Sequence, residues 1–315
     1  MRARMLPLAL LVACVTPVTR TPPVSRGGDE STARTAPAAQ STDALRLRIA
    51  TTIAAQSGAE VAVFYEDLAR PDSLRVHADL SFHAASTMKV PVMIELFRRV
   101  DSGTLSLDQA VPIVNTFHSI VDGTPFSLDS ATDSEFSLYH RAGGRATLAE
   151  LNELMIAHSS NFATNIMIEL LGAKTVNATA HSLGATHMTV LRGVEDGKAF
   201  AAGLNNTTTA RDLGVLLTGI ERGTVASPRS CAAMKAVLLQ QEFSTEIPAG
   251  LPPGVRVAHK TGWITGTRHD AAIVYPPGRP PYVLVVLTRN IPSVKDAQDL
   301  IASISRDVYA FNASR

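Results

Sequence analysis

Apolar residues recur along this chain with helical and with strand-like spacing, and the two patterns occupy different regions. Between Ser41 and Gly58, apolar side chains at Leu45, Ile49 and Ile53 follow a four-residue spacing that predicts a helix capped by Ser41. A second helix with one apolar face is predicted at the C-terminus. That face holds Ile301, Ile304, Val308 and Phe311.

Four shorter segments read as strands, and they lie near the two ends of the chain. Residues 59–65 and 73–78 predict one antiparallel pair, and residues 269–275 and 282–288 predict another, each pair joined by a proline-containing turn. Between about residues 86 and 234 helical periodicity dominates. We therefore predict an α/β fold of the α+β type: an antiparallel sheet assembled from both chain ends, flanked by the terminal helices, with an inserted all-helical lobe. A cleft is expected between the lobes.

The N-terminus has a different composition from the rest of the chain. Arg2 and Arg4 precede an apolar run that is too short to span a bilayer, so residues 1–13 are expected to be a signal peptide. Cys14 follows Leu11-Val12-Ala13, a sequence that resembles the bacterial lipobox. We expect export to the cell envelope, either periplasmic or anchored through a lipid on Cys14. An ordinary signal peptide that contains a cysteine is the alternative.

Residues 14–40 are rich in Pro, Thr, Ser and Ala and contain few large apolar residues. They cannot bury enough surface to offset the entropy of ordering, so we predict a disordered tether. The folded domain is then expected to span residues 41–315, with its helical lobe at about 86–234.

The net charge limits the partners that we expect, and the cysteine count limits the possible disulfides. The chain has 29 Lys and Arg residues and 28 Asp and Glu residues, a net charge of +1, which gives no reason to expect nucleic acid as a partner. The membrane is expected as a partner only through the lipid anchor. Cys231 is the only cysteine besides Cys14, so no intramolecular disulfide is expected and Cys231 should be buried.

Ser86 and Lys89 form the first candidate reactive pair. They lie three residues apart at the start of an apolar-periodic helix, and therefore on one face of it. A serine hydroxyl is a weak nucleophile unless a neighbouring base takes its proton, and a lysine can do so when burial or nearby cations lower its pKa. Taken alone, a serine cap followed by a solvent-facing lysine explains the motif equally well.

Two further motifs follow in order. Ser159-Ser160-Asn161 lies between two predicted helices, and Lys260-Thr261-Gly262 precedes a predicted strand. Each is unremarkable alone, because a serine often caps a helix and a lysine often lies on a strand. The three motifs together, in this order and on these elements, correspond to the signature S-x-x-K, S-D-N and K-T-G, with Ser160 at the Asp position of the second motif.

With these motifs the chain resembles the class A serine β-lactamases and, more broadly, the penicillin-recognising enzymes that include the DD-peptidases. The resemblance implies a hydrolase that opens the β-lactam amide through an acyl-enzyme and thereby confers antibiotic resistance. It implies that Ser86 is acylated, that Lys89 acts as base and that Ser159 passes a proton to the leaving nitrogen. The backbone N–H groups of Ser86 and Trp263 would bind the oxyanion.

The same resemblance assigns substrate-binding roles. Asn161 would hold the acyl-side amide of the substrate. Lys260 and Thr261, with Gly262 completing the motif, would face the substrate carboxylate, and Arg268 would be its charge partner. No cofactor and no metal are implied, and we expect a monomer.

The loop that supplies the hydrolytic carboxylate departs from the family pattern. Glu195 matches the expected Glu, but Ala199 stands where the family has an Asn that helps to position water. Asn206 replaces the Asp that usually pairs with the loop's arginine, and Arg192 is one place out of register. We therefore expect the loop to be braced differently. Ser160, in place of the usual Asp of the second motif, is a smaller departure.

Other enzyme classes fit less well. The nine histidines show no His-Glu-x-x-His or His-x-His spacing, and the chain has no Gly-x-Ser-x-Gly. His158 and His259, which neighbour the second and third motifs, are expected to pack structurally. One alternative is a DD-peptidase, or a broader serine amidase or esterase, that deacylates slowly and acts on a cell-wall peptide or an ester. The other is a non-enzymatic envelope lipoprotein that keeps the fold as a binding module. An insertion at about residues 117–144 has no counterpart in the resemblance and is expected to be a solvated loop.

Overall fold

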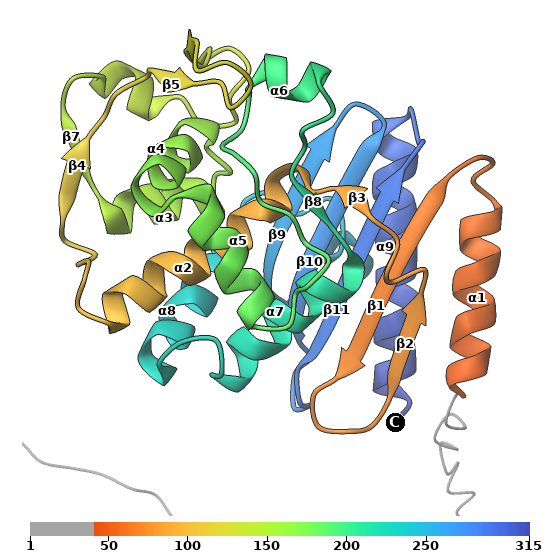
Figure 1. The fold of residues 1–315 in the computed structure, drawn as a ribbon. Coiled ribbons are helices and arrows are strands. Elements are labelled where there is room, and N and C mark those ends of the chain that lie inside the picture. Colours follow the sequence, from red (N-terminus) through yellow and green to blue (C-terminus); the bar gives the residue numbers. More distant parts are fainter. Residues whose placement is uncertain (1–40) are drawn as a thin grey trace, which may run out of the picture. The chain divides into compact units, whose positions relative to one another are not determined.

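The two ends of the chain meet in one antiparallel sheet. A computed structural model, which describes residues 41–315, gives the strand order β2-β1-β11-β10-β9. The strands are β1 (Glu60–Asp67), β2 (Ser73–Val76), β9 (Arg256–Ile264), β10 (Thr267–Tyr275) and β11 (Tyr282–Arg289). Each neighbouring pair is antiparallel (Figure 1). β9, which carries the third motif, is an edge strand.

Side chains that alternate along β1 explain why the sheet is covered on both faces. Val61, Val63 and Tyr65 face α1 (Thr42–Ala54) and α9 (Val294–Ala313), where a core forms with the apolar faces of these two terminal helices. Ala62 and Phe64 face the opposite core, which continues into the helical lobe. The sheet is therefore the wall between two hydrophobic cores.

The helical lobe lies between β2 and β9 in sequence and beside the sheet in space (Figure 1). Its helices are α2 (Lys89–Asp101), α3 (Leu148–Ile156), α4 (Asn161–Leu171), α5 (Ala173–Ser182), α6 (Gly197–Ala201), α7 (Ala210–Arg222) and α8 (Pro228–Leu238). α7 packs closely on the sheet: a Cβ added at Gly214 would lie 2.4 Å from the Phe64 ring.

Short 3-10 turns and paired strands complete the chain. The 3-10 turns are η1 (Ala85–Met88), η2 (Ser137–Arg141) and η3 (Pro248–Gly250). The short strands pair as β3 (Phe82–His83) with β8 (Thr207–Thr208), β4 (Ala110–Pro112) with β7 (Arg145–Thr147), and β5 (Phe117–His118) with β6 (Pro125–Phe126). Helical periodicity did not indicate these pairs. Two of them and η2 lie within or beside the 117–144 insertion, which is thus more ordered than the solvated loop we expected.

The predicted fold class is confirmed: an antiparallel sheet from both chain ends, flanked by terminal helices, with an inserted helical lobe. The predicted signal peptide (1–13), Cys14 and the predicted tether (14–40) lie outside the described residues, and the predicted domain bounds stay predictions. Cys231 is buried with 2% exposure, as expected. Within residues 41–315, no helix combines the length and the apolar character that crossing a bilayer requires.

Candidate active site

Ser86 lies in a tight turn that leads directly into a buried helix. The 3-10 turn η1 carries Ser86, and α2 starts at Lys89. The residue before the serine, Ala85, has φ +46°, a left-handed conformation that an L-residue rarely adopts. The imidazole Nδ1 of His83 accepts a hydrogen bond from the Ala85 backbone N–H at 3.0 Å and so supports this turn. Burial lowers the pKa of His83, which favours the neutral ring that can accept.

Lys89 is fully buried and points at the second motif. Its Nζ donates to the Ser159 carbonyl oxygen at 2.7 Å, to Asn161 Oδ1 at 3.0 Å and to Ser159 Oγ at 3.3 Å. Burial lowers the pKa of Lys89 to about 7, against smaller upward effects of Asp133 and Glu195. A substantial fraction of the amine is therefore neutral at physiological pH and able to accept a proton.

The second motif forms the turn between α3 and α4. Ser159 has φ +59°, which turns its side chain and its carbonyl toward Lys89. Ser160 caps α4, because its Oγ accepts the Ala163 backbone N–H at 3.1 Å. Asn161 is the first residue of α4, and its Nδ2 donates to Glu195 Oε1 at 3.1 Å. One asparagine therefore contacts both Lys89 and Glu195.

Lys260 approaches the same serine from the sheet. Its Nζ donates to Ser159 Oγ and to the Thr261 carbonyl, both at 3.0 Å, and the residue has no exposed surface. Burial and the neighbouring Lys89 lower the pKa of Lys260 well below its usual value. The hydroxyl of Ser159 thus lies between two buried amines, an arrangement through which a proton can pass.

Gly262 allows the edge of the sheet to touch the turn that holds Ser86. A Cβ at this position would lie 2.8 Å from the backbone N of Ser86 and 2.9 Å from that of Thr87, closer than real Cβ contacts allow. Because β9 is an edge strand, alternate backbone N–H groups along it have no strand partner. Only glycine lets this edge come so close to Ser86.

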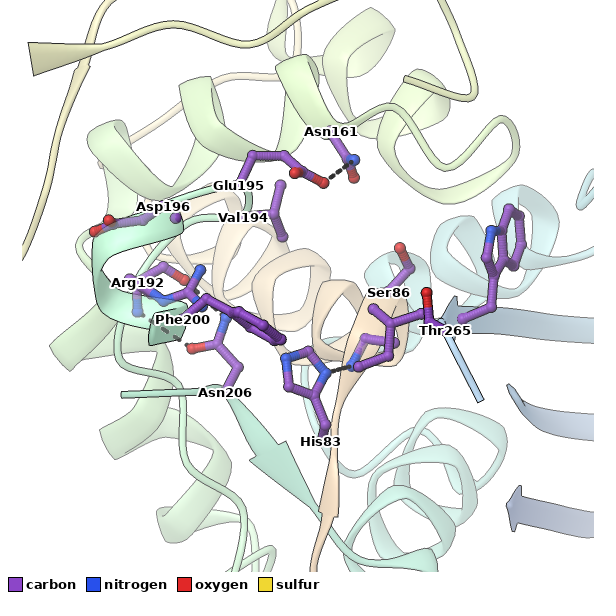
Figure 2. Close-up of a pocket in the computed structure, with 14 residues that line it drawn as sticks. His83, Ser86, Asn161, Arg192, Val194, Glu195, Asp196, Phe200, Asn206 and Thr265 are labelled. Atoms are coloured by element: carbon purple, nitrogen blue, oxygen red, sulfur yellow. Dashed lines mark hydrogen bonds between the residues drawn. The ribbon is translucent and has the colours of Figure 1, made fainter. Parts of the chain in front are cut away.

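Glu195 is held by backbone and side-chain contacts on both sides of it. Its φ is +62°. Asn165, on α4, accepts the Val194 N–H at 2.6 Å and donates to the Val194 carbonyl at 2.9 Å. The Asp196 carboxylate accepts the Ala199 N–H and thereby caps α6. These contacts fix the carboxylate of Glu195 toward Asn161, as Figure 2 shows.

The loop that carries Glu195 is braced by neutral groups. Asn206 Oδ1 accepts the backbone N–H groups of Leu191 (2.8 Å) and Arg192 (3.2 Å), and its Nδ2 donates to the Arg192 carbonyl at 3.0 Å. The Arg192 guanidinium donates to the carbonyls of Leu204 and Gly193. Asn206 therefore braces the loop by hydrogen bonds, whereas the family pattern has an Asp that pairs with the loop's arginine.

A pocket of about 360 Å³ opens in front of Ser86. In Figure 2, Glu195 and Asn161 lie on one side of it, and His83 and Phe200 lie on the other. The rings of His83 and Phe200 are in edge contact, with their centroids 6.1 Å apart. Ala199 is fully buried, and its methyl group has no donor or acceptor that could hold a water in the pocket.

The guanidinium of Arg268 already has a charged partner within the protein. Its guanidinium forms an ion pair with Glu246, a carboxylate without exposed surface, and lies 5.3 Å from the Trp263 ring centroid. Phe243 packs against the same indole at 4.9 Å. Nearby, Thr261 Oγ1 is buried and has no hydrogen-bond partner in the described part of the chain. The cation expected for the substrate carboxylate is therefore already matched by a carboxylate of the protein.

The structure brings most of the predicted site residues together. Ser86, Asn161, Glu195 and Trp263 line the pocket. The other motif residues are buried and do not line it: Lys89, Ser159, Lys260, Thr261 and Gly262. Arg268 lies farther along the sheet, beside Trp263. Sequence reasoning missed the roles of His83 and Asn165, since a single histidine or asparagine carries no motif.

The two histidines beside the motifs bind carboxylates instead of a serine. His158 Nδ1 lies 3.0 Å from Glu242, and His259 Nδ1 lies 3.0 Å from Asp270. Within residues 41–315 no group of three or more His, Cys, Asp or Glu side chains is arranged to hold a metal ion.

Comparison with known proteins agrees with this geometry. A family model described as the β-lactamase enzyme family matches residues 44–311. β-Lactamase AST-1 of Nocardia asteroides is 30% identical over 259 residues, which cover 80% of this chain and 79% of that protein.

Two solved structures extend the comparison. An ancestral class A β-lactamase has a TM-score of 0.72 at 26% identity, covering 84% of this chain and 99% of that one. A point mutant of PBP-A, solved as an acyl-enzyme complex with penicillin G, has a TM-score of 0.73 at 29% identity, covering 87% and 98%. From its motifs, its fold and these matches, the chain belongs to the β-lactamase enzyme family.

Proposed function

We propose that this protein is a serine β-lactamase that hydrolyses the lactam amide through an acyl-enzyme on Ser86. The observation that carries the proposal is the pairing of two bases around one pocket. Lys89, a buried lysine with a pKa of about 7, follows Ser86 by three residues, and a carboxylate, Glu195, lines the pocket. The first suits acylation and the second suits hydrolysis of the resulting ester.

In the acylation step, neutral Lys89 takes the proton of the Ser86 hydroxyl as its oxygen attacks the lactam carbonyl. The backbone N–H groups of Ser86 and Trp263 stabilise the oxyanion, and the contact at Gly262 supports this pairing. When the C–N bond breaks, the Ser159 hydroxyl gives its proton to the lactam nitrogen. It regains one from protonated Lys89, whose Nζ lies 3.3 Å from Ser159 Oγ.

In the deacylation step, Glu195 takes a proton from a water molecule, whose oxygen attacks the ester carbonyl. The Ser86 oxygen then leaves as the C–O bond of the ester breaks and takes up the proton that Glu195 received from the water, which restores both groups. The Asn161 amide, which donates to Glu195, orients the carboxylate and is placed to hold the acyl-side amide of the substrate as well. Lys260, with Thr261 and Gly262, would receive the substrate carboxylate. Arg268 would assist only in competition with Glu246.

One experiment distinguishes β-lactam hydrolysis from the alternative functions. The purified folded domain, residues 41–315, is mixed by stopped flow with a chromogenic cephalosporin, alongside the Ser86→Ala and Glu195→Gln variants. We expect steady turnover in the unmodified protein, no reaction in the first variant, and a stoichiometric burst followed by slow release in the second. No reaction in the unmodified protein would refute the proposal.

A DD-peptidase-like enzyme is the second candidate. Two observations favour it: Ala199 is buried where the family has a water-positioning Asn, and the acylated PBP-A mutant shares the fold. In that case the unmodified protein would give a burst without turnover and would act on a cell-wall peptide.

We further infer that the protein is exported and held at the cell envelope. The inference rests on the apolar run that ends at Cys14 and on the absence of another use for this cysteine. Metabolic labelling with a tagged fatty acid, compared between the full chain and its Cys14→Ser variant, tests the lipid anchor. Sedimentation of the folded domain tests our expectation of a monomer.

A further inference from the structure

The 117–144 insertion reaches the second motif through a single carboxylate. Asp133 lies in this insertion, 28 residues before Asn161 in sequence. Its Oδ1 accepts the Asn161 backbone N–H at 2.9 Å, with Oδ2 at 3.1 Å from the same nitrogen. Its Oδ2 also accepts the Phe162 backbone N–H at 2.9 Å. One half-buried aspartate therefore binds the first two amides of α4.

This contact completes the cap of α4. A helix leaves its first N–H groups without internal partners, and Ser160 Oγ satisfies only that of Ala163. Asp133 satisfies the two amides before it and places a negative charge at the positive end of the helix dipole. The helix cap formed by Ser160 is thus supplemented by the Asp133 carboxylate, which comes from a segment distant in sequence.

Tyr139, also in the insertion, fixes the orientation of Asp133. Its hydroxyl donates to Asp133 Oδ2 at 2.9 Å, and its ring packs against Phe162 with centroids 4.8 Å apart. Burial and the charge of Asp133 raise the pKa of Tyr139, so the phenol keeps the proton that it donates. The aspartate is held from both sides and cannot turn away from the helix.

The charge of Asp133 also acts on Lys89. Three charged groups face this lysine from three different segments: Asp133 from the insertion, Glu195 from its loop, and Lys260 from β9. Burial lowers the pKa of Lys89 and the two carboxylates raise it, whereas Lys89 in turn lowers the pKa of Lys260. The remaining polar contacts of Lys89 are the neutral groups of Ser159 and Asn161.

From these contacts we propose that Asp133 is a positioning residue of the acylation site: it holds Asn161 in place and supplies negative charge to the environment of Lys89. The insertion is then part of the catalytic apparatus instead of a surface loop. The kinetic part of this inference rests on the proposed function, since it concerns the acylation of Ser86.

The Asp133→Asn variant tests both parts of the role. The side-chain shape is kept, but the charge and one acceptor are lost. We expect acylation by a chromogenic cephalosporin to slow by about 10- to 100-fold. Without the carboxylate Lys89 loses its proton more readily, so the acid limb of the acylation rate should move to lower pH by about 0.5 to 1 unit.

Two further variants serve as comparison. Asp129→Asn removes an exposed carboxylate from the same insertion, and both the acylation rate and the acid limb should stay as in the unmodified protein. Tyr139→Phe keeps the charge of Asp133 but releases its orientation. It should slow acylation by about three- to tenfold and leave the acid limb in place. Thermal unfolding of each variant identifies any loss of the fold.

Titration of Lys89 by NMR tests the charge effect without any substrate. The protein is labelled with 13C at lysine Cε, and the Lys89 signal is assigned through Lys89→Gln. We expect a lower titration midpoint for Lys89 in Asp133→Asn than in the unmodified protein. An unchanged midpoint, or an acylation rate within twofold of the unmodified protein, would overturn the proposal. If the unmodified protein is not acylated at all, the proposed function fails, while this titration still decides the charge effect of Asp133.

Discussion

Replacing Gly262 by alanine tests the contact between the sheet edge and the reactive turn. The new Cβ would lie 2.8 Å from the Ser86 backbone N, whereas ordinary Cβ contacts begin at 3.4 Å. The atoms that it meets belong to the backbone at the start of a helix and cannot rotate away. The strand or the turn must therefore shift by about 0.6 Å, or both must share that displacement.

Such a shift moves the backbone N–H of Ser86 relative to that of Trp263, the two groups that we propose as donors to the oxyanion. Displacements of this order, or loss of one donor, slow acyl transfer by about 100-fold. We expect the acylation rate of Gly262→Ala, measured under single-turnover conditions with a chromogenic cephalosporin, to fall by about 30- to 100-fold. Crowding should also lower the free energy of unfolding by about 1–3 kcal/mol.

A matched variant separates the geometric effect from that of adding a methyl group. At Gly197, on the wall of the same pocket, an added Cβ meets no atom within 4 Å. Gly197→Ala should therefore acylate at a rate within about twofold of the unmodified protein, since it leaves the donors in place. If Gly262→Ala also acylated within threefold of the unmodified rate, the close approach of β9 to Ser86 would not matter for catalysis, and our reasoning would be refuted.

Three other variants test separate parts of the site. Asn165→Ala removes the two hydrogen bonds that hold the backbone beside Glu195. Deacylation should slow, so that the acyl-enzyme accumulates in a quench assay, and the free energy of unfolding should fall by about 1–3 kcal/mol. An unchanged deacylation rate would contradict this. Lys89 has a pKa of about 7 in the folded protein, below its usual value of 10.5. Burial of this amine therefore lowers the free energy of unfolding by its full amount at and below pH 7, and this destabilisation disappears as the pH rises to 10.5. Lys89→Met should therefore gain stability relative to the unmodified protein at pH 7, in denaturant titrations, and lose that advantage toward pH 10; a constant difference would be inconsistent. Glu246→Gln removes the partner of Arg268, so KM for a carboxylate-bearing lactam should fall by about three- to tenfold while melting occurs earlier; an unchanged KM would show that Arg268 does not reach the substrate.

The fold was largely predictable from local patterns. Strands such as β1 and β11 are short apolar runs between turn residues, and helices such as α9 repeat apolar positions every three or four residues. The order of these segments then limits the topology, because strands at both ends of a chain must pair across whatever lies between them. The predicted family and enzyme class are confirmed as well, since three spaced motifs are specific even when each is weak alone.

The braces of the site could not be predicted in the same way. The contacts of Asn165 with Val194, of Asp133 with Asn161 and of Glu246 with Arg268 join residues 29, 28 and 22 positions apart without any repeating pattern. Which loop carboxylate meets which helix end or cation depends on the three-dimensional course of the loop, and composition does not encode that. The roles assigned to Ser86, Lys89 and the other motif residues stay predictions until they are measured.

The left-handed backbone at Ala85, Ser159 and Glu195 has a consequence for the evolution of stability. These are three of the five non-glycine residues with positive φ in the described chain, and each such residue costs about 1–3 kcal/mol. Selection for thermostability alone would replace them with glycine or relax their turns, and would in doing so dismantle the arrangement around Ser86. A thermostable descendant that keeps its activity should instead have improved its packing elsewhere, for example along the terminal helices, and should retain these three unfavourable conformations unchanged.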